Sequence, residues 1–119
     1  MHYRVERAYP NLTFTNKPVE VATIPGTDRL VVIEELGQMW SFRHDEGTAS
    51  AEPFVDFHEF DPEVSRTYAI TFHPKFAENR FIYAFLVRNL RGKQNLEDGT
   101  RIVRFRVTES EPPRIDLAS

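Results

Sequence analysis

Short apolar runs separated by turn-forming residues make up most of the first half of the chain. Four such runs are present, at residues 19–24, 30–33, 39–42 and 54–57. The first of them stops at Pro25-Gly26-Thr27-Asp28, a cluster of residue types that favour turns. Runs of this length, rich in β-branched and aromatic residues, are typical of β-strands. The pattern therefore predicts four short strands in close succession, with one helical turn within 58–66 because Pro62 suits a first helical position.

The same order of turns and apolar runs recurs in the second half of the chain. Asn79-Arg80 leads into the apolar run 81–85, as Asp28-Arg29 leads into 30–33. In both halves a Gly and a strand ending in Phe-Arg follow, and the second half carries an insertion over residues 88–98. An internal repeat of about 50 residues, each unit an antiparallel four-stranded meander, is the sequence signature of β-propeller blades. Chance similarity between two strand-turn-strand units is the alternative.

The length of 119 residues limits how much of a propeller the chain can form. Propellers close with about 4–8 blades of about 40–50 residues each. We therefore expect an all-β chain of about two blades, the first over residues 17–60 and the second, incomplete, over residues 66–119. Two blades leave broad apolar faces and strand edges uncovered. Residues 1–119 are thus interpreted as a partial propeller domain, a fragment whose partners are the remaining blades of its own parent chain.

Composition narrows the classes of function. Hydrophobic residues make up 40% of the chain and charged residues 28%, and the formal net charge is −3. This balance excludes an intrinsically disordered chain and the basic surface of a nucleic-acid-binding protein. The sequence also predicts no membrane span and no signal peptide, because apolar runs of the necessary length are absent. Without any Cys, disulfides, thiolate catalysis and Cys-based zinc sites are excluded.

Three stretches carry a family resemblance. Residues 68–83, Tyr-Ala-Ile-Thr-Phe-His-Pro-Lys-Phe-Ala-Glu-Asn-Arg-Phe-Ile-Tyr, resemble the Gly-Leu-Ala-Phe-His-Pro-Asp-Phe…Asn…Tyr-Val-Tyr segment of the glucose/sorbosone dehydrogenase family. Residues 14–19 resemble the Thr-Asn-Pro motif that precedes the first blade of that family. Residues 30–39 resemble its Leu-Val-Val-Glu-x-x-Gly-x-Ile strand pair, and the whole resemblance spans residues 3–107.

The resemblance implies a six-bladed propeller of the exported kind, located in the periplasm or outside the cell. Some members of the family are quinoproteins that oxidise sugars with pyrroloquinoline quinone and calcium, whereas others, such as Hedgehog-interacting proteins, only bind partners. The chain thus resembles the N-terminal segment of an oxidoreductase that oxidises a sugar or a related alcohol by hydride transfer to a quinone, which carries the chemistry. A non-catalytic propeller that binds carbohydrate or protein is the alternative.

The chain departs from the family pattern where cofactor contacts are expected. Val64 stands where the sugar oxidases have a Gln that contacts the quinone, and valine cannot make that hydrogen bond. Residues 66–69, Arg-Thr-Tyr-Ala, replace a Gly-Leu-Leu-Gly run, and Lys75 stands where Asp is commoner. The catalytic His of the oxidases belongs to a later blade. The resemblance therefore implies no catalytic residue in this chain, with quinone and calcium bound by the parent protein and not by this segment alone.

An acidic cluster with one imidazole lies between the two predicted blades. It consists of Asp56, His58, Glu59, Asp61 and Glu63. Carboxylates at this density could bind a hard cation such as calcium. The cluster lacks the glycine-anchored spacing of a calcium-binding loop. We therefore interpret it as a solvated connection and predict no metal site.

Strand direction separates the remaining candidates. In an antiparallel four-stranded unit, the loops after strands two and four lie at one end, and those after strands one and three lie at the other. The first set holds the turn 34–38, the connection 61–66 and the insertion 88–100, and functional residues concentrate on long loops such as the last two. The other set holds His73, which precedes a Pro and is interpreted as a structural residue that holds a turn. The predicted substrate-binding residues are therefore Arg66, Arg88 and Arg91.

Overall fold

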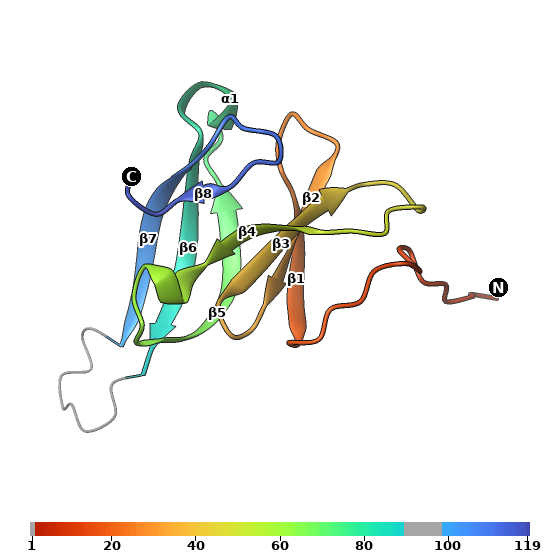
Figure 1. The fold of residues 1–119 in the computed structure, drawn as a ribbon, viewed down its shortest axis with the longest axis horizontal. Helices are drawn as coiled ribbons and strands as arrows, with labels where there is room; N and C mark the ends of the chain where they lie inside the picture. Colours follow the sequence, from red (N-terminus) through yellow and green to blue (C-terminus); the bar gives the residue numbers. More distant parts are fainter. Residues whose placement is uncertain (1, 90–98) are drawn as a thin grey trace.

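The computed structural model describes residues 2–89 and 99–119, and these residues form two four-stranded antiparallel sheets (Figure 1). The first sheet consists of β1 (Pro18–Thr23), β2 (Arg29–Glu34), β3 (Gln38–Arg43) and β4 (Glu52–Asp56). The second sheet consists of β5 (Val64–Phe72), β6 (Phe81–Arg88), β7 (Thr100–Val107) and β8 (Ile115–Asp116). Each strand pairs with the next one along the sequence, so both sheets are meanders. The prediction of an all-β chain built from antiparallel four-stranded units is confirmed.

Two short helical turns connect the strands. The 3₁₀-helix η1 (Phe57–Glu59) follows β4, and the α-helix α1 (Phe76–Asn79) lies in the β5–β6 connection. The helical turn predicted within 58–66 was wrong in position, because it begins earlier and β5 occupies the end of that range. The carboxylate of Asp56 accounts for the earlier start, since it accepts the backbone N–H of His58 and caps the turn. Within the described residues, no helix is long and apolar enough to span a membrane.

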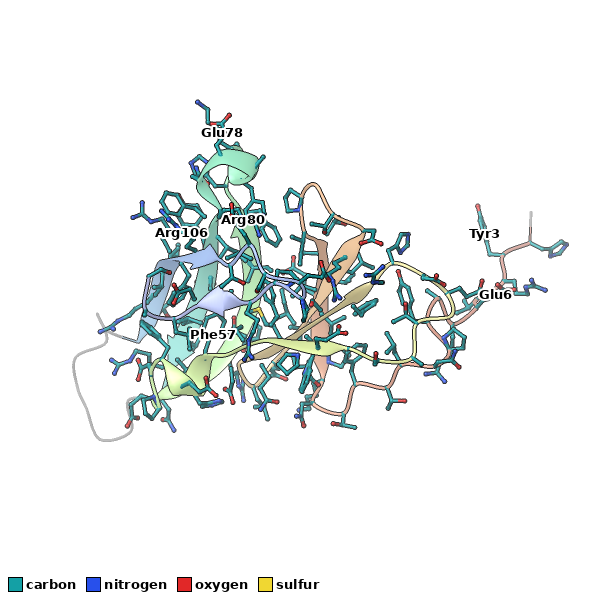
Figure 2. The ribbon with its side chains drawn as sticks, turned by 45° about the horizontal axis from the view of Figure 1, so that its top comes forward. Tyr3, Glu6, Phe57, Glu78, Arg80 and Arg106 are labelled. Atoms are coloured by element: carbon teal, nitrogen blue, oxygen red, sulfur yellow. The ribbon has the colours of Figure 1, made fainter. Side chains whose placement is uncertain are left out.

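The two sheets share one apolar core. Strand alternation directs Val31 and Ile33 of β2 and Ile82 of β6 into this core, and all three side chains are buried. Phe57 lies between the sheets (Figure 2), with its ring centroid 5.7 Å from that of Phe105 in β7. Because each sheet buries one apolar face against the other, the hydrophobic effect holds the two sheets together.

The N-terminal segment, residues 7–16, covers the opposite face of the first sheet. Val32 and Phe42 alternate with the core residues of their strands and therefore point to this face, where they pack against Leu12. The ring of Tyr9 meets that of Phe42 edge to face at a centroid distance of 4.8 Å. The β2–β3 part of the first sheet is thus covered on both faces, whereas β1 remains exposed.

The outward face of the second sheet carries exposed apolar and aromatic side chains. Ile102 of β7 is 73% exposed and Tyr68 of β5 is 42% exposed. Phe81, Tyr83 and Phe85 alternate with buried residues along β6, and each remains partly exposed. The second sheet therefore presents an apolar face of the kind that marks an interaction surface.

Candidate functional site

The connections that strand direction singled out lie, as far as the structure describes them, at one end of both sheets (lower edge in Figure 1). This end holds the β2–β3 turn, the connection 57–63 between the sheets, the start of β5 and the end of β6. The strand register places Arg66 opposite Val87, next to Arg88, so the two arginines lie on neighbouring strands at this end. The third predicted residue, Arg91, lies outside the described residues.

Arg66 forms a polar cluster with residues of both sheets. Its Nε lies 3.4 Å from Oε1 of Glu35 in the β2–β3 turn, and its Nη1 donates to the hydroxyl oxygen of Tyr68 at 3.4 Å. The other carboxylate oxygen of Glu35 is 4.0 Å from Nζ of Lys17. The Tyr68 hydroxyl, and after it the Glu35 carboxylate, raises the pKa of Arg66 above its ordinary value. We call Lys17, Glu35, Arg66 and Tyr68 the rim cluster.

Backbone hydrogen bonds hold the rim cluster across the junction of the two sheets. The N–H of Glu35 donates to the carbonyl of Lys17 at 3.0 Å, and the N–H of Thr67 donates to the carbonyl of Glu35 at 2.9 Å. Lys17 has a left-handed backbone (φ 52°), which costs a residue with a Cβ about 1–2 kcal/mol, and the bond from Glu35 helps to hold it there.

The two charged side chains at the centre of the rim cluster differ in exposure. The Arg66 side chain is 54% exposed, whereas that of Glu35 is 17% exposed. Arg66 therefore presents accessible N–H donors beside a partly shielded acceptor. Donors and acceptors in this arrangement can bind the hydroxyl groups of a small polar ligand.

Arg88 is already engaged within the chain. Its Nε donates to Oδ2 of Asp61 at 2.6 Å, and both side chains are only 15% exposed. Burial disfavours the charged Asp61 carboxylate, but hydrogen bonds from the Glu63 N–H and the Arg88 guanidinium outweigh it and lower the pKa of Asp61. The ion pair fixes the connection between the sheets to the end of β6. Arg88 therefore has a structural role, although it also lies near Arg66.

The acidic cluster between the sheets is satisfied largely by its own hydrogen bonds. One oxygen of Asp56 accepts the backbone N–H of His58 at 3.0 Å and lies 2.9 Å from its ring nitrogen Nδ1. Burial opposes ionisation of Asp56, but these bonds and one from Gln38 lower its pKa. The His58 ring also lies over Gly37, where an added Cβ would come within 3.4 Å of it. Within residues 2–89 and 99–119, no group of three His, Asp or Glu side chains is arranged to hold a metal ion.

His73 lies at the opposite end of the second sheet, in the β5–β6 connection. Its Nδ1 accepts the backbone N–H of Lys75 at 3.0 Å and the side-chain amide of Asn79 at 2.9 Å. The side-chain Oδ1 of Asn79 in turn accepts the backbone N–H of Phe81 at 2.9 Å, where β6 begins. The prediction that His73 bonds a backbone group is confirmed, and its role in stabilising the turn stays a prediction.

Val64, which the family resemblance aligns with a quinone-contacting Gln of the sugar oxidases, belongs to the shared core. It is 2% exposed and opens β5 at the junction between the sheets. Its side chain packs with other apolar residues and has no hydrogen-bonding capacity. This position therefore contributes to packing.

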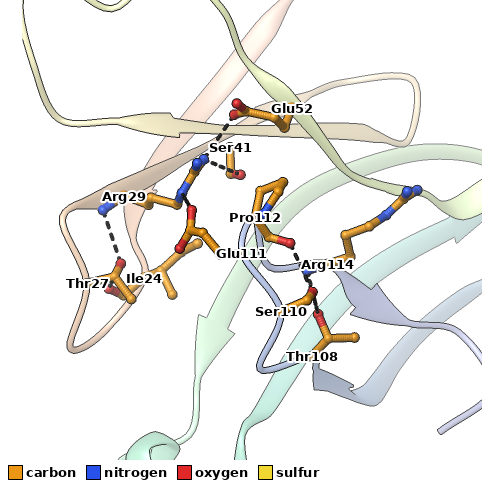
Figure 3. A network of polar contacts seen from close by, with 10 residues as sticks. All are labelled: Ile24, Thr27, Arg29, Ser41, Glu52, Thr108, Ser110, Glu111, Pro112 and Arg114. Atoms are coloured by element: carbon orange, nitrogen blue, oxygen red, sulfur yellow. Dashed lines mark hydrogen bonds and ion pairs between the residues drawn. The ribbon is translucent and has the colours of Figure 1, made fainter.

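A second polar network joins the two sheets at the end away from the rim cluster (Figure 3). Arg29 of β2 is 5% exposed, and its Nη1 donates to Ser41 at 3.2 Å and to Glu52 at 3.0 Å. Its Nε donates to Glu111, in the β7–β8 connection, at 2.8 Å. Burial lowers the pKa of Arg29, but the bonds to Glu52 and Glu111 outweigh it and raise the pKa. This network has a structural role, because its hydrogen bonds join residues of the first sheet to one another and to the β7–β8 connection.

Sequence reasoning did not single out Lys17, Glu35 or Tyr68 as functional candidates. Strand direction had already placed the turn 34–38 at the same end as Arg66, so a carboxylate close to that arginine was a usable signal. It could not decide whether Glu34 or Glu35 would meet Arg66, because that choice depends on the strand register. In the structure Glu35 makes the contact.

No protein-family model matches this chain, and no solved structure gives a significant match. The glucose/sorbosone dehydrogenase resemblance therefore depends on the sequence motifs alone.

Proposed function

We propose that the two sheets are consecutive blades of a β-propeller of the glucose/sorbosone dehydrogenase type. The observation that supports this is the packing of two sequential four-stranded meanders through one apolar core. Neighbouring propeller blades are antiparallel four-stranded sheets that bury their faces against one another. The exposed apolar face of the second sheet is then the surface against which a third blade packs.

Within such a propeller, we propose oxidation of a sugar or a related alcohol as the reaction. Pyrroloquinoline quinone and calcium, held by the remaining blades, would supply the hydride-accepting chemistry, and those blades would also supply the catalytic base. The contribution of this chain is the rim cluster, where Arg66 donates to substrate hydroxyl groups and Glu35 keeps its guanidinium in place. An exported location in the periplasm or outside the cell accompanies this proposal.

One observation favours a second candidate, a propeller that binds carbohydrate or protein without catalysis. Val64 is buried in the shared core at the position where a quinone-contacting Gln is expected. The valine side chain has no polar group with which to hold a cofactor. The rim cluster would then bind hydroxyl groups for recognition alone.

The experiment is a dye-linked oxidation assay on the longest natural form of the protein, supplied with pyrroloquinoline quinone and calcium and tested with aldoses and polyols. Substrate-dependent dye reduction supports the dehydrogenase. Retention of the protein on immobilised sugars without dye reduction supports the binding propeller, and the failure of both assays overturns both proposals. The 119-residue chain alone is expected to reduce no dye above a heat-denatured control, since the catalytic base is supplied from elsewhere.

Two arginine variants test whether the rim cluster is the sugar-binding site, for the dehydrogenase and for the binding propeller alike. Arg66→Ala is expected to raise the KM or the Kd for the sugar about tenfold, because it removes a charged hydrogen-bond donor. Arg43→Ala is the control, since Arg43 is also exposed and lies at the other end of the first sheet. Equal effects of the two substitutions on the KM or the Kd would show that the rim cluster does not bind the sugar.

A further inference from the structure

Strand alternation sends Glu34 and Glu35 to different environments although they are consecutive in the sequence. Glu35 belongs to the rim cluster, whereas Glu34 follows Leu30 and Val32 on the face of β2 that the N-terminal segment covers. Glu34 is 2% exposed. A carboxylate this deeply buried needs partners, because removing an anion from water is costly unless the anion is bonded or paired.

The partners of Glu34 are neutral. Its Oε2 accepts the backbone N–H of Asn16 at 2.8 Å, and its Oε1 accepts the indole N–H of Trp40 at 2.5 Å. No Lys, Arg or His of the described residues forms an ion pair with it. A carboxylate has about four acceptor positions, so two remain after these bonds. The negative charge of Glu34 therefore has hydrogen bonds but no countercharge in the described part of the chain.

A cavity lies directly beside this carboxylate. It has a volume of about 230 Å³, is open to solvent, and lies between the N-terminal segment on one side and β2, β3 and the β3–β4 loop on the other. Phe14, Trp40 and Ala51 give it apolar walls, and Asn16 and Glu34 give it polar groups. At about 30 Å³ per molecule, this is room for roughly seven waters or for a small organic molecule of similar size.

We propose that this cavity binds a small organic cation, a primary ammonium or guanidinium with a short apolar body, whose N–H groups donate to Glu34. The charge of the ligand neutralises the buried carboxylate, and charge-assisted hydrogen bonds are the strongest available to it. The apolar body packs against Trp40 and Phe14. A neutral alcohol of the same shape can pack against the apolar walls, but it leaves the charge of Glu34 without a counterion.

The test uses n-butylammonium, with 1-butanol as the neutral ligand of the same shape. Trp40 is the only tryptophan of the chain and lines the cavity, so its fluorescence and its single indole N–H resonance report binding directly. Saturable binding of n-butylammonium to the natural sequence is expected at pH 7. 1-Butanol is expected to bind at least tenfold more weakly, because it lacks the charge. This comparison needs no variant, so it decides the proposal even where a substitution destabilises the fold.

Two Glu→Gln variants test whether the charge of Glu34 is the one that binds n-butylammonium. Glu34→Gln keeps an oxygen acceptor and nearly the same shape, and we expect it to weaken n-butylammonium binding at least tenfold. Glu20→Gln makes the same charge change on exposed β1, away from the cavity, and should leave the affinity unchanged. Equal binding of the ammonium and the alcohol, an unaffected Glu34→Gln variant, or a complete lack of binding would each overturn the proposal. None of these outcomes depends on Arg66 or on sugar oxidation, so the cavity and the rim cluster are tested separately.

Discussion

Arg29 of β2 donates its Nε–H to Oε1 of Glu111 across 2.8 Å, although the two residues are 82 positions apart in the sequence. The bond crosses from the first sheet to the β7–β8 connection of the second sheet (Figure 3). It adds a directional contact to the non-directional attraction of the shared apolar core. The two sheets are therefore positioned by polar as well as apolar contacts.

Arg29→Met is expected to destabilise the protein by about 2 kcal/mol, because it leaves buried Ser41 without a partner and Glu52 and Glu111 without a cation. Urea unfolding at pH 7 measures this. Glu111→Gln is the comparison, and a loss below about 1 kcal/mol is expected because that side chain is largely exposed. An Arg29→Met protein as stable as the natural one would show that the network contributes nothing net.

Asp61 should make stability depend on pH in the acid range. Its pKa is lowered in the folded state by the Glu63 N–H and by Arg88, against the opposing effect of burial. The unfolded chain therefore binds the proton more tightly, so this stabilisation is complete above the ordinary value of 3.8 and is lost as the pH falls through the folded pKa. Asp61→Asn should lower stability at neutral pH and flatten the acid slope.

The measurement is the free energy of unfolding in urea at several pH values between about 5 and 2. Arg88→Gln should flatten the slope in the same direction, because it removes one of the two donors that lower the pKa of Asp61. An Asp61→Asn protein with an undiminished acid slope would assign the pH dependence to other carboxylates.

His73→Ala should destabilise the β5–β6 turn by about 1–2 kcal/mol, since it removes an acceptor for Lys75 and Asn79. A melting curve should show a fall of several degrees. Arg66→Ala, at an exposed position, should change stability by less than about 0.5 kcal/mol. The reverse order of the two melting temperatures would contradict the structural assignment of His73. So would loss of ligand binding by the His73 variant at unchanged stability.

The outward face of the second sheet should bind hydrophobic dyes and promote self-association, because Ile102 and neighbouring aromatic rings are exposed there. Ile102→Thr keeps a β-branched residue on β7 and should lower dye fluorescence at least twofold. Val5→Thr is the matched control, since Val5 is 98% exposed but lies in the N-terminal region, away from this sheet. A monodisperse monomer by light scattering that binds no dye would show that this face needs no partner.

The strands of the first sheet were predictable from the sequence with small errors at their ends. The run 30–33 became β2 (Arg29–Glu34), and the run 39–42 became β3 (Gln38–Arg43). Alternation and turn residues act over a few positions, so they can be read without knowledge of the tertiary structure. The direction of the strands also placed Arg66 and Arg88 at one end, because antiparallel pairing follows from short connections.

Prediction was weaker where pairing partners decide the length of a strand. The second unit was expected to begin at about residue 66, without a length for its first strand, and β5 runs from Val64 to Phe72. Pairing with β6 extends it, since Arg66 and Thr67 lie opposite Val87 and Leu86. Val64, Thr67 and Tyr68 favour a strand but Ser65, Arg66 and Ala69 interrupt any apolar run, so the hydrogen bonds to β6 fix how far the strand extends.

The all-β class and the repeat of two four-stranded units depend on local periodicity, so both could be predicted from the order of the amino acids. The packing of the two sheets settled which charges meet. Arg88 pairs with Asp61, Arg66 with Glu35, and Arg29 with Glu52 and Glu111. The tertiary structure also decided that Glu34 is buried under the N-terminal segment while Glu35 remains at the rim. The physical reason is that side chains far apart in the sequence become neighbours only when the two sheets pack, and packing determines which polar groups lose water and must find partners.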